Sequence, residues 1–248
     1  MVAQSARNLW TIFRHEFSLY FGSPIVYFIG ALWFLFVGVF FSISVASFNQ
    51  GAPLTMDNTI STMGFLAIFI APGLTMRLIS EEMRTGTHEL LLTAPVRDWE
   101  VVVGKWLGAW GVLTVFVLIS LIFPLILTFL GSPDGGDILT AYIGLWLLWG
   151  MALAIGVMAS AMTPYQIIAF IISLALLIGL WLAQAVFNFI PNPLIQEIAS
   201  EATIFSHFQN TMVQRGIIQV ENLVYFIGVI AIALFLATNF LGTRRWRA

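Results

Sequence analysis

The chain has 248 residues and a mean hydropathy of +0.96; 60% of its residues are hydrophobic, 9% are charged and none is cysteine. These values exclude an ordinary soluble domain, a disulfide-rich secreted domain, thiolate metal sites and cysteine nucleophiles. The formal net charge is −2 and no basic patch suits nucleic acid, so nucleic acid is not expected as a partner.

Residues 7–21 are expected to form an amphipathic helix that lies along the membrane surface. At 100° per residue, the polar side chains of this segment fall on one narrow face, and the aromatic and aliphatic side chains fall opposite. Arg14 belongs to the polar face, whereas Glu16 lies near the edge of the apolar face. Two interpretations of Glu16 stay open: its carboxylate reaches out to water, or it pairs with a basic residue of residues 80–105.

Six apolar segments are each long enough to cross a hydrocarbon core of ~30 Å, which needs ~20 residues. The third segment is longer than necessary, so its first turns are expected to stand in the cytosol, and Pro124 is expected to kink its outer end. In the fourth, Ala152, Gly156 and Ser160 form a ridge of small residues that favours helix packing over a substrate path. The sequence therefore predicts one all-α membrane domain over residues 1–248, with spans at 25–45, 60–79, 101–130, 138–162, 166–189 and 222–241.

Lysine and arginine residues set the expected orientation of these spans. With the N-terminus inside, nine of the ten basic residues face the cytoplasm and only Arg215 lies outside. Both termini are therefore expected in the cytoplasm, in a multi-pass protein of the plasma (inner) membrane. The connection between the second and third spans then faces the cytoplasm, where ATP and soluble ATPases are found.

Residues 80–105 form the most densely charged stretch of the chain and connect the second span to the third. Ser80 followed by Glu81 and Glu82 is a good helix start, because a serine oxygen can cap free N–H groups and acids suit the positive end of the helix dipole. Gly86 is expected to end this helix after about one and a half turns.

A second short helix is predicted in the same stretch, with Thr87 as its cap and Pro95 forcing the chain out of the helical region. Asp98 is expected to begin the helix of the third span. A charged, helical connection between two spans is suited to docking a soluble partner.

The segment 190–221 joins the fifth and sixth spans on the outer side. Its apolar residues recur at helical spacing, which predicts one or two short helices at the outer leaflet or dipping into it. Gly216 is expected to end them and Asn222 to cap the last span. A lid without transport chemistry and a gate for substrate are both open as roles for this segment.

No catalytic or metal-binding motif is complete in the sequence. Lys105, the only lysine, does not belong to a phosphate-binding loop, because Trp99 occupies the place of the first glycine. His88 begins a motif like that of zinc proteases, but Leu92 stands where the second histidine would be. The chain is therefore not expected to be an enzyme, and no cofactor or metal is expected to bind to it.

The predicted spans also have no Asp, Glu, Lys, Arg or His in their cores. Carriers driven by ions usually keep such a group inside the membrane, because the coupling ion needs a binding group there. Energy for uphill movement is therefore expected to come from another subunit, and residues 80–105 provide a place to receive it.

Three stretches of sequence resemble ABC-2 type transporter permeases, and among these the gliding-motility-associated group. The first is R-x-E-x-x-x-x-F-x-S-P, which starts at Arg14 and includes Glu16. The second is EEMRTGTHELLLTAPVRDWEVVVGKWLGA at residues 81–109. The third is SHFQNTMVQRGIIQVENLVYF at residues 206–226, similar to the segment before the last span in that group. The resemblance covers essentially the whole chain.

The resemblance implies that residues 7–21 are a connecting helix on the inner leaflet and that residues 190–221 are the outer re-entrant element. It also implies a cytoplasmic coupling helix that seats in a groove of a separate ATPase subunit, where ATP and Mg bind. The residues implied for this helix are Glu81, Glu82, Arg84, Thr85, Gly86, Thr87 and Glu89. Two six-span subunits, either two copies or one copy with a related permease, would pair in membrane lipid, and an accessory extracytoplasmic protein is a further candidate partner.

The function implied by the resemblance is the permease subunit of an ATP-binding cassette exporter. ATP hydrolysis in the partner subunit would drive substrate translocation across the plasma membrane. The alternative is a membrane scaffold that couples an ATPase to a motility or cell-envelope assembly without moving a solute. Reversing the charges of Glu81 and Glu82 together is expected to uncouple the ATPase and leave the protein folded, because both acids are predicted to lie away from the span cores.

Overall fold

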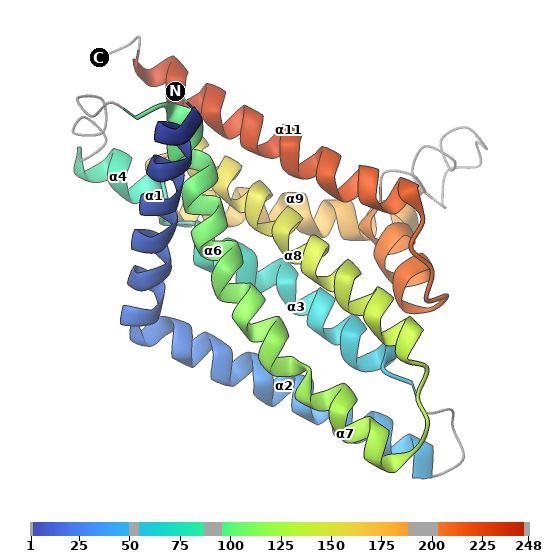
Figure 1. Ribbon diagram of the computed structural model, residues 1–248. Coiled ribbons are helices and arrows are strands. Elements are labelled where there is room, and N and C mark those ends of the chain that lie inside the picture. Colours follow the sequence, from blue (N-terminus) through green and yellow to red (C-terminus); the bar gives the residue numbers. More distant parts are fainter. Residues whose placement is uncertain (1, 50–54, 87–95, 188–202, 246–248) are drawn as a thin grey trace.

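The computed structural model describes residues 2–49, 55–86, 96–187 and 203–245, and over these residues it contains helices and no strands. Six helical segments are long and apolar enough to cross a membrane (Figure 1). The prediction of an all-α membrane protein with six spans is thus confirmed. The helices are α1 (Val2–Gly22), α2 (Pro24–Asn49), α3 (Asp57–Thr75), α4 (Ser80–Thr85), α6 (Asp98–Ser120), α7 (Ile122–Leu130), α8 (Gly135–Met162), α9 (Gln166–Phe187), the π-helix η1 (Phe205–Val213) and α11 (Val220–Arg245).

Helix α8 forms the centre of the bundle. It is buried along most of its length and packs against α3, α6, α9, α11 and η1. Helices α2, α9 and α11 lie around it and expose many large apolar side chains. Such an apolar outer surface suits contact with membrane lipid. The backbone polar groups of each helix are paired within the helix, as lipid also requires.

The two ends of the bundle differ in their charges. Helix α1 crosses one end, where α4, the start of α6 and the end of α11 also lie (Figure 1). We call this the α4 end and the opposite one the η1 end. The basic residues Arg77, Arg84 and Arg97 belong to the α4 end, whereas Arg215 lies between η1 and α11. This separation is the pattern that the positive-inside rule describes.

The third span is broken near Pro124, as the sequence predicts. Helix α6 ends at Ser120 and α7 begins at Ile122. Pro124 has no N–H to donate to the carbonyl of Ser120 four residues earlier. The hydroxyl of Tyr142 in α8 donates to that carbonyl at 3.0 Å instead. A neighbouring helix therefore satisfies the polar group that the break leaves free.

Helix η1 is fixed to the bundle by apolar side chains. The predicted outer segment is described only from residue 203 onward. Phe208 and Met212 are fully buried, and they fill notches at two glycines of neighbouring helices. An added Cβ atom would lie 2.3 Å from the Phe208 ring at Gly64 of α3 and 2.7 Å from the Met212 sulfur at Gly144 of α8.

The turn between η1 and α11 contains Gly216, which has a φ of 62°, a conformation that favours glycine. The helical segment ends before Gly216, as predicted. The predicted cap at Asn222 is wrong, because α11 already begins at Val220. The Oδ1 atom of Asn222 instead lies 2.9 Å from Nδ1 of His207 in η1.

Candidate functional site

Helix α1 packs across α6 over a row of glycines. An added Cβ atom would lie 2.7 Å from the Ile12 side chain at Gly104 and 2.6 Å from Cβ of Glu16 at Gly108. Because glycine has no Cβ atom at these two positions, the backbones of α1 and α6 can approach each other closely. One side of α1 therefore packs on protein, so the amphipathic pattern reflects helix packing, and the position at the membrane surface stays a prediction. The helix begins at Val2, five residues before the predicted start.

The second half of α1 is fixed to the end of α3 by Tyr20. This side chain is buried, and its hydroxyl donates to the carbonyl of Leu74 at 2.8 Å. The guanidinium of Arg77 lies 5.9 Å from the centre of the ring. Burial, together with the nearby carboxylate of Glu16, raises the pKa of Tyr20. The phenol therefore stays protonated and keeps its role as a donor.

Lys105 is buried between two carboxylates from different helices. Its Nζ atom lies 2.7 Å from Oε1 of Glu16 and 2.8 Å from Oε1 of Glu82. Lys105 is 4% exposed and Glu16 is 8% exposed. We call these three residues the lysine bridge. Because they belong to α6, α1 and α4, one ammonium group links three helices.

The lysine bridge decides between the two interpretations of Glu16. Pairing with a basic residue of residues 80–105 is confirmed, and the interpretation in which Glu16 reaches out to water is wrong. Glu16 lies one turn after Ile12 and one turn before Tyr20, so it belongs to the side of α1 that faces the bundle. Glu82 pairs with Lys105 in the first turns of α6, so the prediction that Glu81 and Glu82 lie away from the span cores stays a prediction.

The start of α4 is fixed by α8. Oγ of Ser160 accepts hydrogen bonds from the backbone N–H groups of Ile79 and Ser80 at 3.1 and 3.0 Å. The prediction that Ser80 caps α4 is wrong, because its own hydroxyl donates to the carbonyl of Met76 in the preceding turn. A serine hydroxyl inside a helix commonly bonds back in this way. The cap therefore comes from a residue distant in sequence.

The ridge of small residues in α8 serves helix packing. An added Cβ atom at Gly156 would lie 2.0 Å from Oγ1 of Thr75, so only glycine lets α3 and α8 approach this closely. Ala152 is buried on the same ridge, and Ser160 is fully buried one turn after Gly156. The packing interpretation of this ridge agrees with the structure.

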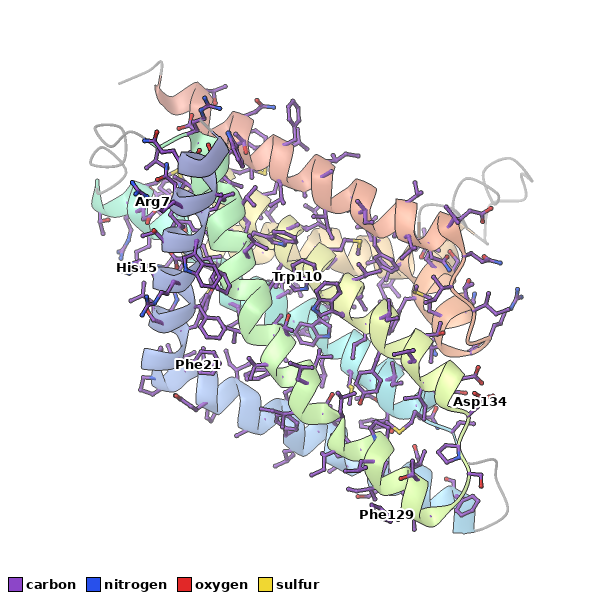
Figure 2. All side chains as sticks on the ribbon, in the orientation of Figure 1. Arg7, His15, Phe21, Trp110, Phe129 and Asp134 are labelled. Carbon is purple, nitrogen blue, oxygen red and sulfur yellow. The ribbon has the colours of Figure 1, made fainter. Side chains whose placement is uncertain are left out.

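Helices α6 and α8 are also joined through tryptophan side chains. Trp106 and Trp110 donate their indole N–H groups to the carbonyls of Gly150 and Trp146, at 2.9 and 3.1 Å. The ring of Trp110 stacks on the rings of Trp106 and Trp146, with centroid distances of 4.6 and 4.1 Å. Figure 2 labels Trp110 between the two helices. Hydrogen bonds and ring stacking thus hold α6 against the central helix.

The exposed part of α4 contains three of the predicted coupling residues. Arg84, Thr85 and Gly86 are exposed, and Glu81 is partly exposed. Gly86 ends the helix with a φ of 74°, as predicted. Thr87, Glu89 and the second short helix predicted before Pro95 lie outside the described residues. On α1, Arg14 is exposed.

A pocket of about 350 Å³ lies between α1 and α4, beside the lysine bridge. It is lined by Tyr20, Arg77 and Glu81, together with the lysine bridge itself. The polar lining and the exposed residues next to it give the α4 end a polar surface that adjoins the spans.

Two features of this site are not predicted from the sequence. The row formed by Gly104, Gly108 and Gly111 has the i, i+4, i+7 spacing of one helix face, and this spacing is a signal for close helix packing. Lys105 follows the first of these glycines directly. The sequence offers Glu16 as a partner for a basic residue of residues 80–105, but it does not indicate which basic residue, nor that Glu82 is the second partner.

A comparison with known families agrees with this architecture. A family model described as "ABC-2 family transporter protein" matches residues 10–246, a range that includes all six spans and α4. No curated protein matches the chain. The family match does not separate groups within the family, so the gliding-motility-associated group stays a prediction. The chain therefore belongs to the ABC-2 family of transporter proteins, as a multi-pass permease component of an ABC transporter.

Proposed function

We propose that this chain is the permease subunit of an exporter in which a separate cytoplasmic ABC ATPase docks on α4. Membership of the ABC-2 family supports the association with an ABC ATPase. The exposed surface of α4, at the end of the bundle that gathers the basic residues, supports the place of docking. ATP and Mg then bind in the partner subunit, and hydrolysis there drives translocation across the plasma membrane.

The observation that carries this proposal is the lysine bridge. A charge pair buried away from water resists separation, because either partner alone would be a buried, uncompensated charge. A displacement of α4 moves Glu82, and Lys105 of α6 and Glu16 of α1 follow it. We infer that α1, α4 and α6 move together as a rigid body when the ATPase closes on ATP. Differential binding of the ATPase to two arrangements of the spans then shifts their populations.

The orientation and assembly of the transporter follow from the same end of the molecule. The basic residues of the α4 end support a cytoplasmic position for this end and for both termini. Helix α1 then lies at the inner leaflet, with Arg14 facing the lipid head groups or the cytoplasm. Two copies, or one copy with a related permease, pair above two ATPase subunits.

The test is co-purification of an ATPase with this chain from its native membrane, in nanodiscs. The test variant is Glu81→Lys with Arg84→Glu, which reverses two charges on α4 and keeps the net charge. Glu82 is left in place, because its reversal would put a second positive charge beside the buried Lys105. The matched control is Arg215→Glu with Glu221→Lys, which makes the same two reversals on exposed residues of the η1 end.

We expect the ATPase to co-purify with the wild type and the control, and to be lost with the test variant while its unfolding temperature is unchanged. Equal co-purification in both variants would place the ATPase elsewhere on the chain. If no ATPase associates with the wild type even when hydrolysis is trapped, the proposal of an ATP-driven exporter is wrong.

A further inference from the structure

A second pocket opens on the apolar outer surface, in the half of the bundle that contains the η1 end. It has a volume of about 690 Å³ and lies between α2, α3, α9 and η1. Sites for small molecules usually measure ~300–1,000 Å³. None of its lining residues belongs to the lysine bridge or to α4.

One wall of this pocket is aromatic. Phe36 and Phe40 of α2 contribute to it, together with Phe65 of α3 and Trp181 of α9. Phe65 and Trp181 meet edge to face with their ring centroids 6.0 Å apart. The three phenylalanines are each more than 40% exposed, so the wall is open at the outer surface of the described bundle. An alkyl chain gains dispersion contacts on such a wall. A fully polar molecule would bury polar groups there without hydrogen-bond partners.

The other wall is polar and includes Gln209, whose side-chain oxygen lies buried behind the wall without a hydrogen-bond partner. Nε2 of Gln209 in η1 donates to Oγ of Ser61 in α3 at 2.6 Å. The hydroxyl groups of Ser61 and Thr62 donate to backbone carbonyls of their own helix. Oε1 of Gln209 is buried and has no hydrogen-bond partner. A buried acceptor without a partner is costly, and a ligand with an O–H or N–H group would remove that cost.

The charge of the pocket restricts the ligand further. Its described lining residues include no Asp, Glu, Lys, Arg or His. A phosphate, sulfate or carboxylate group would lose water there and gain no counter-charge. An uncharged head group that donates a hydrogen bond, such as a hydroxyl, fits the same place without this penalty.

We propose that this pocket binds one uncharged amphiphile from the membrane. Its alkyl chain lies along Phe36, Phe40 and Phe65, and a hydroxyl of its head group donates to Oε1 of Gln209. The proposal goes beyond the function proposed above, because binding needs neither an ATPase nor docking on α4. Its test can therefore fail while the ATPase test succeeds, and the reverse.

The test uses a dodecyl β-glucoside probe with a photoreactive diazirine in its alkyl chain, added to the purified full chain in nanodiscs. Labelled positions are mapped by mass spectrometry after irradiation. We expect labels on the α2 and α3 segments that contain Phe40 and Phe65. Unlabelled dodecyl β-glucoside is expected to displace the probe at a concentration at least about tenfold lower than dodecanoate, which has the same chain length and a charged head group.

Two variants and a control locate the binding site. Thr62→Phe fills the pocket and is expected to abolish labelling. Gln209→Leu removes the acceptor at similar size and is expected to weaken binding about three- to tenfold, the effect of one hydrogen bond. The control is Ser42→Phe, which adds the same ring on an exposed part of α2 and is expected to leave labelling unchanged.

The proposal is overturned if dodecanoate competes as well as dodecyl β-glucoside, because the pocket would then hold any lipid chain. It is also overturned if the probe labels the Gln209→Leu variant as strongly as the wild type. If Thr62→Phe does not fold, Gln209→Leu still decides the outcome, because it adds no volume.

Discussion

The two ends of the bundle are held together by different kinds of contact. At the α4 end, charged and polar atoms meet specific partners: Lys105 meets two carboxylates, and Ser160 binds two backbone N–H groups. At the η1 end, Phe208 and Met212 fill notches at glycines, and directional contacts join uncharged groups such as Gln209 and Ser61. Directional contacts fix the relative position of helices, whereas apolar contacts mainly require that a space be filled. We therefore expect the charged contacts of the α4 end to make it move as one unit, and we expect the η1 end to adjust more easily.

The largest expected effect comes from removing the cation of the α4 end. Lys105→Met leaves the buried carboxylate of Glu16 without its counter-charge and removes the partner of the partly exposed Glu82, which is expected to cost about 3–5 kcal/mol of unfolding free energy. Unfolding in detergent, followed by circular dichroism, measures this loss. The control Arg14→Met removes an exposed cation of α1 and is expected to have no measurable effect. Equal losses in the two variants would show that the lysine bridge does not stabilise this end.

Alanine at one glycine from each end compares the two kinds of packing directly. Gly108→Ala pushes a Cβ against Cβ of Glu16, so α1 must move, at a cost of up to about 3 kcal/mol. The nearest neighbours of the Cβ added by Gly64→Ala are side-chain atoms of Phe208 and Leu148, with no backbone atom among them, so a smaller loss is expected. Gly179→Ala is the control, because no atom lies within 4 Å of its added Cβ. Thermal unfolding of the three variants should rank them in this order, and the reverse order of the first two would contradict the comparison.

A smaller effect is expected when the cap of α4 is removed. Ser160→Ala leaves the N–H groups of Ile79 and Ser80 without their acceptor, at an expected cost of about 1–2 kcal/mol. Hydrogen exchange of these two amides should become faster. The control Ser47→Ala removes a hydroxyl that bonds only its own helix on an exposed part of α2. Unchanged exchange in Ser160→Ala would mean that α4 is positioned by other contacts.

The smallest effect is expected for a directional contact in the half of the bundle toward the η1 end. Tyr142→Phe removes the donor that satisfies the Ser120 carbonyl at the break before α7. Hydrogen bonds between membrane helices contribute about 0.6 kcal/mol on average, so a loss of about this size is expected in the unfolding free energy. Tyr165→Phe, at an exposed tyrosine, is the control. A loss much larger than this average would show that directional contacts matter equally in both halves.

Features that depend on local signals are predictable from the sequence. The six spans follow from the lengths of the apolar runs, and the break at Ser120 follows from the missing N–H of Pro124. The end of α4 at Gly86 follows from the left-handed conformation that glycine adopts readily. In each case the decisive group lies within a few residues of the feature that it controls.

The contacts of the candidate site depend instead on residues far apart in the sequence. Glu16 and Lys105 are separated by 89 positions, and Ser80 and Ser160 by 80. The sequence marks Glu16 as an exception on an apolar face, but it cannot name the partner. Ser80 has the local pattern of a helix cap, yet a serine of α8 takes that role because the bundle brings it there.

The most direct test of the account is a distance measurement between α1 and α4 by electron paramagnetic resonance. Spin labels at Ser18→Cys and Arg84→Cys have no background, because the chain contains no cysteine. Both positions are exposed, and neither belongs to the lysine bridge. The account predicts one narrow distance distribution, which becomes broad when Lys105→Met is added. Equal distributions with and without Lys105 would contradict the claim that the lysine bridge holds α4 to the spans.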